Sequence, residues 1–322
     1  MLSIPVVFLG SDPELGRRLS ACFSEMVWPA EYRIAPVFHS NPEPDWTAVL
    51  PRQGRGMVFV EISVAGIAAE SALIRNLRAY NENLQIALMA DDDSDYFTIA
   101  QDFGIGNIFK KQGFDTSMVR ALIIRQLTGN IFGFAPFFPY GYAVGPLFRT
   151  FVGRVVVDEV IEECFEACKP YVNLKEISTF KMFLHELLTN TFSYAIEGIT
   201  PEDRDSKHLH TRPEVNIEER RAFKISLVSD DEKVGFSVQD STGNLSMLRV
   251  LQKLRRQSRI GAEKMPPGVW DESGRGISMV YRYSRFVVNI LKDVRTEIIF
   301  LQYHKPELNR FESIIITEMQ SF

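Results

Sequence analysis

The sequence predicts two domains of different class, an α/β doubly wound domain followed by an α+β two-layer sandwich. A length of 322 residues exceeds what one domain usually holds. Residues 1–125 alternate short apolar runs with amphipathic stretches, which is typical of βαβ units around a parallel sheet. Residues 150–322 begin with helical patterns and continue with strand-like runs, the order of an α+β fold. A segment that is uncharged except for its last residue, 126–149, separates the two.

Each predicted strand of the first domain is a continuous apolar run, as expected for strands that are buried on both faces. The first strand covers residues 4–10, and a helix starts at about Pro13. Further strands follow at 56–63, 84–90 and 107–111, with helical patterns between them. This order gives the doubly wound prediction for residues 1–125.

The segment 126–149 consists of 23 uncharged residues, 126–148, followed by Arg149. Glycines and prolines interrupt it too often for a membrane-spanning helix. We interpret it as an aromatic, Gly/Pro-rich linker that packs on its own domains, or alternatively as a dimer or partner surface. Its aromatic residues are Phe132, Phe134, Phe137, Phe138, Tyr140, Tyr142 and Phe148.

The second domain, 150–322, starts with an amphipathic helix from Val157 that carries Cys164 and Cys168 on its apolar stripe. This cysteine pair is typical of small core residues rather than of a metal site. A second helix is expected from about Glu176 to Ala195. Strands are expected at 223–229, 233–240, 286–293 and 296–303.

The overall composition excludes several classes of protein. With 36 Lys and Arg against 41 Asp and Glu, the formal charge is −5, so no overall field attracts nucleic acid. Hydrophobic residues at 45% and charged residues at 24% exclude extensive disorder. Three cysteines are too few for a disulfide framework and favour the cytoplasm. Asp12 follows the first apolar run too soon for a signal peptide or a membrane span.

Three separated motifs occur in the second domain: H-E-L-L-T-N at 185–190, V-Q-D-S-T-G-N at 238–244 and G-R-G-I-S-M-V at 274–280. Glu186 and Asn190 stand four residues apart on one helix face, where a carboxylate and an amide oxygen suit magnesium and water. Asp240 ends a strand, where its carboxylate could accept a hydrogen bond from an exocyclic amine such as adenine N6. A polar helix face and an ordinary turn are the alternatives.

The third motif and a basic stretch complete the candidate site. Gly274 and Gly276 flank Arg275 at a helix start, which leaves backbone amides open to phosphate, unless the loop is simply a glycine-rich turn. Residues 249–259 carry five basic side chains and no acidic one, which fits either a phosphate-contacting lid or a solvated helix face. His208 and His210 lie in a polar stretch and are expected at the surface.

In this order the motifs resemble the N box and the two glycine boxes of the GHKL (Bergerat-type) ATPase superfamily over residues 150–303. The resemblance implies ATP and magnesium as cofactors, with Asn190 as the magnesium ligand, Glu186 as the catalytic base and Asp240 as the adenine contact. Two departures are Thr242, where the family has glycine, and Arg295 in place of the glycine before Thr296. The other nucleotide-binding residues that it implies are Gly243, Gly274, Arg275, Gly276 and Thr296.

No H-E/D-x-(R/K) phosphoacceptor helix precedes the N box, so the domain differs from an ordinary sensor histidine kinase. It is most similar to the anti-sigma-factor serine kinases. That similarity implies phosphorylation of a partner protein, an anti-anti-sigma or sigma-factor-like protein, on serine or threonine. A non-catalytic, partner-binding switch with a degenerate pocket is the alternative, and a homodimer is possible in either case.

The first domain resembles the receiver domain of response regulators in two-component systems. Gly10 and Ser11 stand at the acidic pair of that family, with Asp12 one residue late. Glu61 stands at the phosphoacceptor aspartate, Met89 at the Thr/Ser position, and Lys111 alone matches. The resemblance implies a pseudo-receiver that accepts no phosphate and regulates by docking or dimerising. Glu61 and Lys111 are expected to form an ion pair, the alternative being two separate polar residues at strand ends.

Overall fold

The structure is a computed structural model of residues 1–322. It describes residues 2–26, 28, 32–39, 48–63, 67–91, 96–111, 115–172, 177–196, 198, 214–258, 285–305 and 313–321. The chain divides into two compact units. Unit 1 comprises Met1–Pro139 and Ser313–Ile315, and unit 2 comprises Tyr140–Glu312 and Ile316–Phe322.

Unit 1 is built on a parallel sheet whose strands lie in the order β2-β1-β3-β4-β5. This is the 2-1-3-4-5 order of flavodoxin-like doubly wound folds, so the α/β prediction is confirmed and is compatible with a receiver-like fold. Residues Ser313–Ile315 of β13 add antiparallel to β5. The strands are β1 (Leu2–Leu9), β2 (Tyr32–His39), β3 (Gly56–Glu61), β4 (Leu84–Ala90), β5 (Asn107–Lys110) and β13 (Ser313–Met319).

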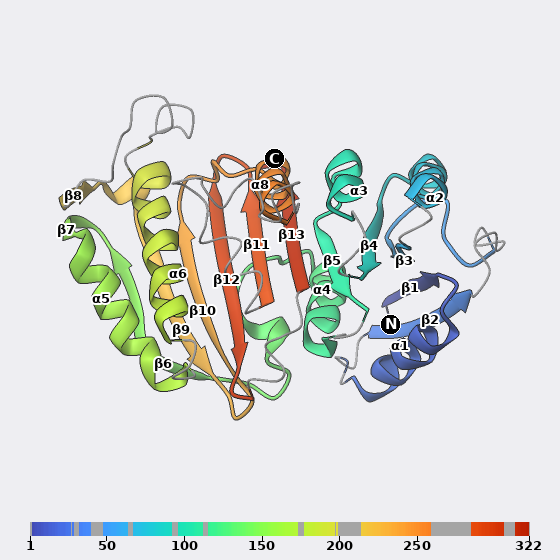
Figure 1. Ribbon diagram of the computed structural model, residues 1–322, viewed down its shortest axis with the longest axis horizontal. Helices are drawn as coiled ribbons and strands as arrows, with labels where there is room; N and C mark the ends of the chain where they lie inside the picture. The colour runs from blue at the N-terminus through green and yellow to red at the C-terminus, as the bar shows by residue number, and fades with distance from the viewer. Residues whose placement is uncertain are drawn as a thin grey trace, which may run out of the picture. The chain divides into compact units, whose positions relative to one another are not determined.

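Helices cover both faces of this sheet, with α2 and α3 on the side opposite to α1 and α4 (Figure 1). Because β3 and β4 are buried on both faces, almost every side chain along them is apolar. Phe59 of β3 contacts Phe23 of α1 and Phe109 of β5. The helices are α1 (Pro13–Glu25), α2 (Ile67–Tyr80), α3 (Tyr96–Phe103) and α4 (Thr116–Thr128).

Local signals in the sequence fix the ends of α1 and α4. The Asp12 side chain caps α1 by accepting hydrogen bonds from the backbone N–H groups of Glu14 and Leu15. Pro13 occupies the first turn, where a backbone N–H would have no partner within the helix, so its absence costs nothing. Asp115 caps α4 in the same way. Gly129 ends α4 in the left-handed conformation, which glycine adopts without strain.

The segment 126–149 is shared between the units. Its first part continues α4 to Thr128 and then turns back, so that Pro136 O accepts a hydrogen bond from Arg120, and Phe137 lies under the Arg125 guanidinium. This part buries Phe134, Phe137 and Phe138 in unit 1. Its last part, from Ala143, is strand β6 of unit 2. The first part of the segment therefore packs within unit 1, and the last part forms a strand of unit 2.

Unit 2 contains an antiparallel sheet in the order β11-β12-β10-β9-β6. A separate two-stranded sheet pairs β7 with β8. The strands are β6 (Ala143–Phe151), β7 (Gly153–Val156), β8 (Glu214–Ile217), β9 (Phe223–Ser229), β10 (Lys233–Asp240), β11 (Arg285–Leu291) and β12 (Arg295–Tyr303).

Helices α5 (Val157–Cys168) and α6 (Ile177–Asn190) lie side by side along this sheet (Figure 1). Phe180 and Phe183 of α6 contact the Phe300 ring of β12, so α6 covers the face from which Phe300 projects. The buried stripe of α5 includes Cys164 and Cys168, as predicted. A π-helical turn, η4 (Thr191–Ile196), continues α6, and α8 (Met247–Ser258) follows the end of β10.

Candidate functional site

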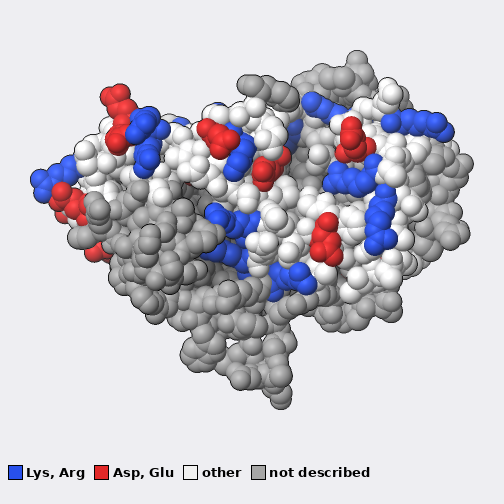
Figure 2. All heavy atoms as spheres, turned by 90° about the horizontal axis from the view of Figure 1, so that it is seen from above, with Lys and Arg blue, Asp and Glu red and all other residues white. Residues whose placement is uncertain are grey.

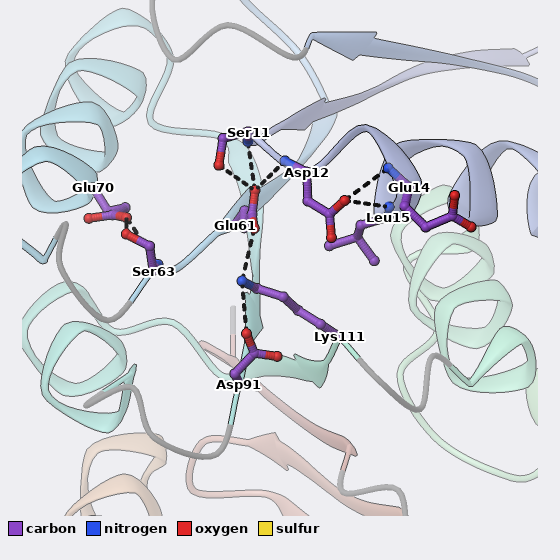
Figure 3. Close-up of polar contacts among 9 residues, drawn as sticks. All are labelled: Ser11, Asp12, Glu14, Leu15, Glu61, Ser63, Glu70, Asp91 and Lys111. Atoms are coloured by element: carbon purple, nitrogen blue, oxygen red, sulfur yellow. Dashed lines mark hydrogen bonds and ion pairs between the residues drawn. The ribbon is translucent and has the colours of Figure 1, made fainter.

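In unit 1 the Glu61 carboxylate occupies the carboxyl ends of the strands, where ligands of open α/β sheets bind (Figure 3). Its Oε2 accepts hydrogen bonds from Ser11 N at 2.6 Å and Asp12 N at 3.1 Å. The Ser11 hydroxyl lies at 3.4 Å from the same oxygen. A Cβ atom on Gly10 would lie 2.5 Å from Oε2, so only glycine fits here.

The predicted ion pair is present: Lys111 Nζ lies 2.8 Å from Glu61 Oε1. Lys111 also reaches Asp91 Oδ2 at 3.1 Å, a contact that the sequence analysis missed because Asp91 follows a strand without any family match. Burial opposes ionisation of Glu61, but the hydrogen bonds from Lys111 and the backbone outweigh it and lower the pKa of this carboxyl. Burial likewise opposes the charged form of Lys111, yet Glu61 and Asp91 raise its pKa overall.

Asp12 and Met89 do not supply receiver chemistry. The Asp12 carboxylate caps α1, and only its backbone N–H contacts Glu61. Met89 is fully buried in β4. The described part of the chain holds no group of three or more His, Cys, Asp or Glu side chains suited to a metal ion. Glu61 is therefore held by amides and an ammonium group, where a receiver would hold magnesium between acids.

In unit 2 the Asp240 carboxylate closes the turn that follows β10. Its Oδ1 accepts hydrogen bonds from the backbone N–H and hydroxyl of Thr242, at 2.8 and 2.7 Å, and from Gly243 N at 3.3 Å. Burial raises the pKa of Asp240 above its ordinary value, although the hydrogen bonds from Thr242 and Gly243 act against that rise. Thr242, the departure from the family pattern, thus holds one oxygen of the carboxylate.

Thr296 stands directly opposite Asp240 in the β10–β12 pair, although the two residues are far apart in sequence. Its hydroxyl lies near enough to favour the ionised carboxylate. It makes no regular hydrogen bond to any residue that the structure describes, and it is buried. A buried hydroxyl without a hydrogen-bond partner destabilises the fold unless another group supplies that partner.

Both residues project from the face that α6 covers. Opposed residues of an antiparallel pair share a face, and side chains two apart along a strand do as well. Asp240 and Thr296 therefore lie on the same face as Phe236 and Phe300, which are themselves opposite one another. Since α6 packs on Phe300, α6 and the Asp240 turn lie on one side of the sheet.

Glu186 and Asn190 are both half-buried at the end of α6, and Asn190 Nδ2 donates to Glu186 Oε1 at 3.0 Å. This hydrogen bond fixes the amide so that its donor faces the carboxylate. The helix then changes to the π-helical turn η4, a feature that is frequent at functional sites. The geometry thus keeps the predicted pair on one helix face.

The structure explains why residue 243 is a glycine, which the sequence analysis attributed only to nucleotide binding. Its φ is +61°, and a Cβ atom there would lie 2.3 Å from Leu291 O and 2.6 Å from Val294 N, in the β11–β12 turn. Its carbonyl accepts a hydrogen bond from Asp293 N. Packing against this turn therefore explains the glycine without any ligand.

Other predicted features are described only in part. Gly274, Arg275, Gly276, His208 and His210 lie outside the described residues. Arg249, Lys253 and Arg255 of the basic stretch are half-buried on α8. Basic and acidic side chains are largely interspersed over the face in Figure 2.

Cys164 and Cys168 are free thiols in the core. Burial raises the pKa of Cys164 to about 12 and that of Cys168 well above its ordinary value. Both are therefore protonated and inert near neutral pH. Among the described helices, none is long and apolar enough to cross a membrane.

Comparisons with known proteins identify no family for this chain. No family model and no curated protein matches the chain. One similar solved structure is the Salmonella typhimurium RcsB response regulator, studied for its conformational dynamism in DNA interaction. It is 18% identical with a TM-score of 0.30 and covers 57% of this chain and 92% of its own. A structure of two RcsB dimers bound to two parallel DNAs has the same identity and TM-score and covers 56% and 89%. Because these TM-scores are low, the doubly wound fold of unit 1 is assigned from its strand order alone.

Proposed function

We propose that the chain is a signalling protein in which unit 1, a pseudo-receiver, regulates a GHKL-type unit 2 that binds Mg-ATP and phosphorylates a partner protein on serine or threonine. One observation supports the nucleotide site: Asp240 of β10 and Thr296 of β12 lie opposite each other, on the face of the sheet that α6 covers. The sequence resemblance assigned both residues to the nucleotide, and the fold brings them together.

The residues on this face suit an adenine base. The Asp240 carboxylate has Oδ1 engaged by its own turn, which leaves Oδ2 as the acceptor for an exocyclic amine. The buried Thr296 hydroxyl would complete its hydrogen bonding against the same ring. Guanine presents a carbonyl oxygen where adenine presents this amine, so an acceptor here favours adenine.

The N-box residues would act at the other end of the nucleotide. Asn190 would offer its amide oxygen to magnesium, since its Nδ2 is committed to Glu186. Glu186 would accept the proton of the partner's hydroxyl as that oxygen attacks. ATP supplies the transferred phosphoryl group, and the protein contributes orientation and proton acceptance.

A switch without catalysis is the second candidate. It is favoured by the Thr242 contacts, which occupy one oxygen of Asp240 within its own turn. In that case unit 2 would bind a partner through a pocket that holds nucleotide weakly or not at all. Unit 1 would have the same regulatory role in both cases.

Calorimetric titration of Mg-ATP and Mg-GTP into the full chain tests the nucleotide site. We expect saturable binding of ATP that is at least about tenfold tighter than that of GTP, because one charged hydrogen bond is lost with guanine. Asp240→Asn and Thr296→Val should each weaken ATP binding by about tenfold or more. Asp231→Asn, an exposed carboxylate at the opposite end of β10, should bind as the wild type does.

Catalysis is tested separately from binding. Glu186→Gln should still bind ATP but should lose transfer of labelled phosphate to protein substrates in an extract of the source cells. A folded wild-type chain that gives no heat with Mg-ATP would overturn the nucleotide site. Binding without any transfer in wild type would overturn the kinase and leave the switch.

A further inference from the structure

We infer that strand β6 is a homodimer interface, at which the edge strand of unit 2 meets β6 of a second copy of this chain. The inference concerns a surface that the proposed nucleotide chemistry does not use. It rests on five apolar side chains along residues 140–152, here named the β6 patch: Tyr140, Tyr142, Val144, Phe148 and Val152.

Exposed apolar side chains gather in this short segment. Among the described residues, eight large hydrophobic side chains are exposed, and five of them form the β6 patch. Tyr140 is 84% exposed, Val144 59% and Phe148 55%. Single exposed hydrophobic residues are ordinary, whereas a contiguous group usually marks an interaction site.

Among the described strands, none pairs with the second edge of β6, which carries the patch. Strand β6 lies last in the order of the sheet and pairs with β9 on one side. Val144 stands opposite Val228 and Phe148 opposite Ser226, so both project from one face, the face away from Phe223 and α6. Pro146 and a bulge interrupt the pairing before Phe148, and residues Phe148–Phe151 then run regularly beside β9.

The apolar area matches what a stable dimer needs. Taking about 150–250 Å² for each aromatic side chain and somewhat less for each valine, the exposed fractions sum to roughly 500 Å² per copy. A standard interface buries about 800 Å² per partner, of which about 60% is apolar, or roughly 480 Å². The exposed area of the five side chains together is therefore about the apolar area of one side of a standard interface.

The charges favour a second copy over a charged partner. Residues 140–152 contain no Asp, Glu or Lys, and the one cation, Arg149, pairs with Glu163 at 3.2 Å. Lys224 Nζ lies 3.9 Å from the centre of the Phe148 ring, and the face of the ring stabilises this cation. Residues 140–152 of two copies therefore bring no unpaired charge of their own together about a two-fold axis.

Sedimentation equilibrium of the full chain between about 1 and 100 µM tests the inference. We expect a reversible monomer–dimer equilibrium in this range. Phe148→Glu should raise the dimer dissociation constant by about 30-fold or more, as the loss of a central aromatic contact does. Val144→Lys, at a second exposed position of the patch, should act in the same direction.

The matched control is Met182→Glu, which places the same charge at a side chain of similar exposure, 47%, on α6. It should leave the equilibrium unchanged. Amide hydrogen exchange adds a local readout, because the Phe148–Phe151 amides should be slower at 100 µM than at 1 µM in wild type. A wild type that is monomeric at 100 µM, or a dimer that tolerates Phe148→Glu, would overturn the inference.

Discussion

At the scale of single residues, Glu61 shows how one substitution changes the chemistry of a strand end. A glutamate is one methylene longer than aspartate, and here its carboxylate reaches the backbone N–H groups of Ser11 and Asp12. Lys111 neutralises it from the other side. Both oxygens of the Glu61 carboxylate thus contact groups of unit 1 itself, the backbone N–H groups on one side and the Lys111 ammonium group on the other.

Replacement of Glu61 by glutamine should destabilise unit 1 by about 1–3 kcal/mol at neutral pH, because Lys111 loses a buried charged partner. The pKa of Glu61 lies below its usual 4.5, so its contribution is complete above pH 4.5 and is lost as pH falls through the lower, folded-state pKa. Urea unfolding of wild type and variant should therefore differ from pH 5 to 8 and converge in acid.

The control for this experiment is Glu14→Gln, since Glu14 pairs with Arg17 at the exposed surface. That change should cost less than about 0.5 kcal/mol. If the difference between wild type and Glu61→Gln were the same at pH 3 and pH 7, the ion pair would not be the cause.

At the scale of elements, two of the strands that the sequence analysis missed, β2 and β6, share a physical reason, whereas β7, β8 and β13 were missed without a proline. Both β2 and β6 contain a proline, Pro36 and Pro146, which argues against a central strand. Each lies at the edge of its sheet, where one side of the strand needs no partner.

The start of α1 tests the role of Asp12 at this scale. Asp12→Ala should destabilise the chain by about 1 kcal/mol, because it removes the acceptor for the N–H groups of Glu14 and Leu15. Asp12→Asn retains a capping oxygen and should cost only a few tenths of a kcal/mol. Chemical denaturation measures both, and an equal loss in the two variants would show that the charge matters rather than the cap.

At the scale of the whole molecule, the C-terminal strand β13 contributes to both units. Ser313–Ile315 belong to unit 1, where they pair with β5, and Ile316 onward belongs to unit 2. In unit 2, Met319 O accepts from Lys292 N, and the Glu318 carboxylate accepts from Met247 N at the start of α8. The last described strand of the chain is thus needed for each fold.

Truncation after Glu312 should therefore destabilise both units by several kcal/mol each. Ile314, Ile315 and Ile316 are almost fully buried, and each buried isoleucine contributes about 1.5–3 kcal/mol. Limited proteolysis with mass mapping should reveal new cleavage in both units. Truncation after Met319 is the control and should leave the pattern unchanged, and protection of either unit in the longer deletion would contradict the shared role.

Patterns in the sequence predict the doubly wound class of the first part, the main helices, the central strands and the Glu61–Lys111 pair. Continuous apolar runs, helical periodicity and family spacing are local signals, and these elements depend on little else. The sequence also marked residues 126–149 as too apolar for a solvated linker, while leaving open which surface they cover.

The remaining features follow from the three-dimensional fold, because the contacts that define them join residues that are distant in sequence. It divided the aromatic segment into a part buried in unit 1 and an exposed edge strand. It assigned the Asp12 carboxylate to a helix cap and Gly243 to a close approach of the β11–β12 turn. It placed Asp91 beside Lys111 and Thr296 opposite Asp240, through strand pairings that no local pattern encodes.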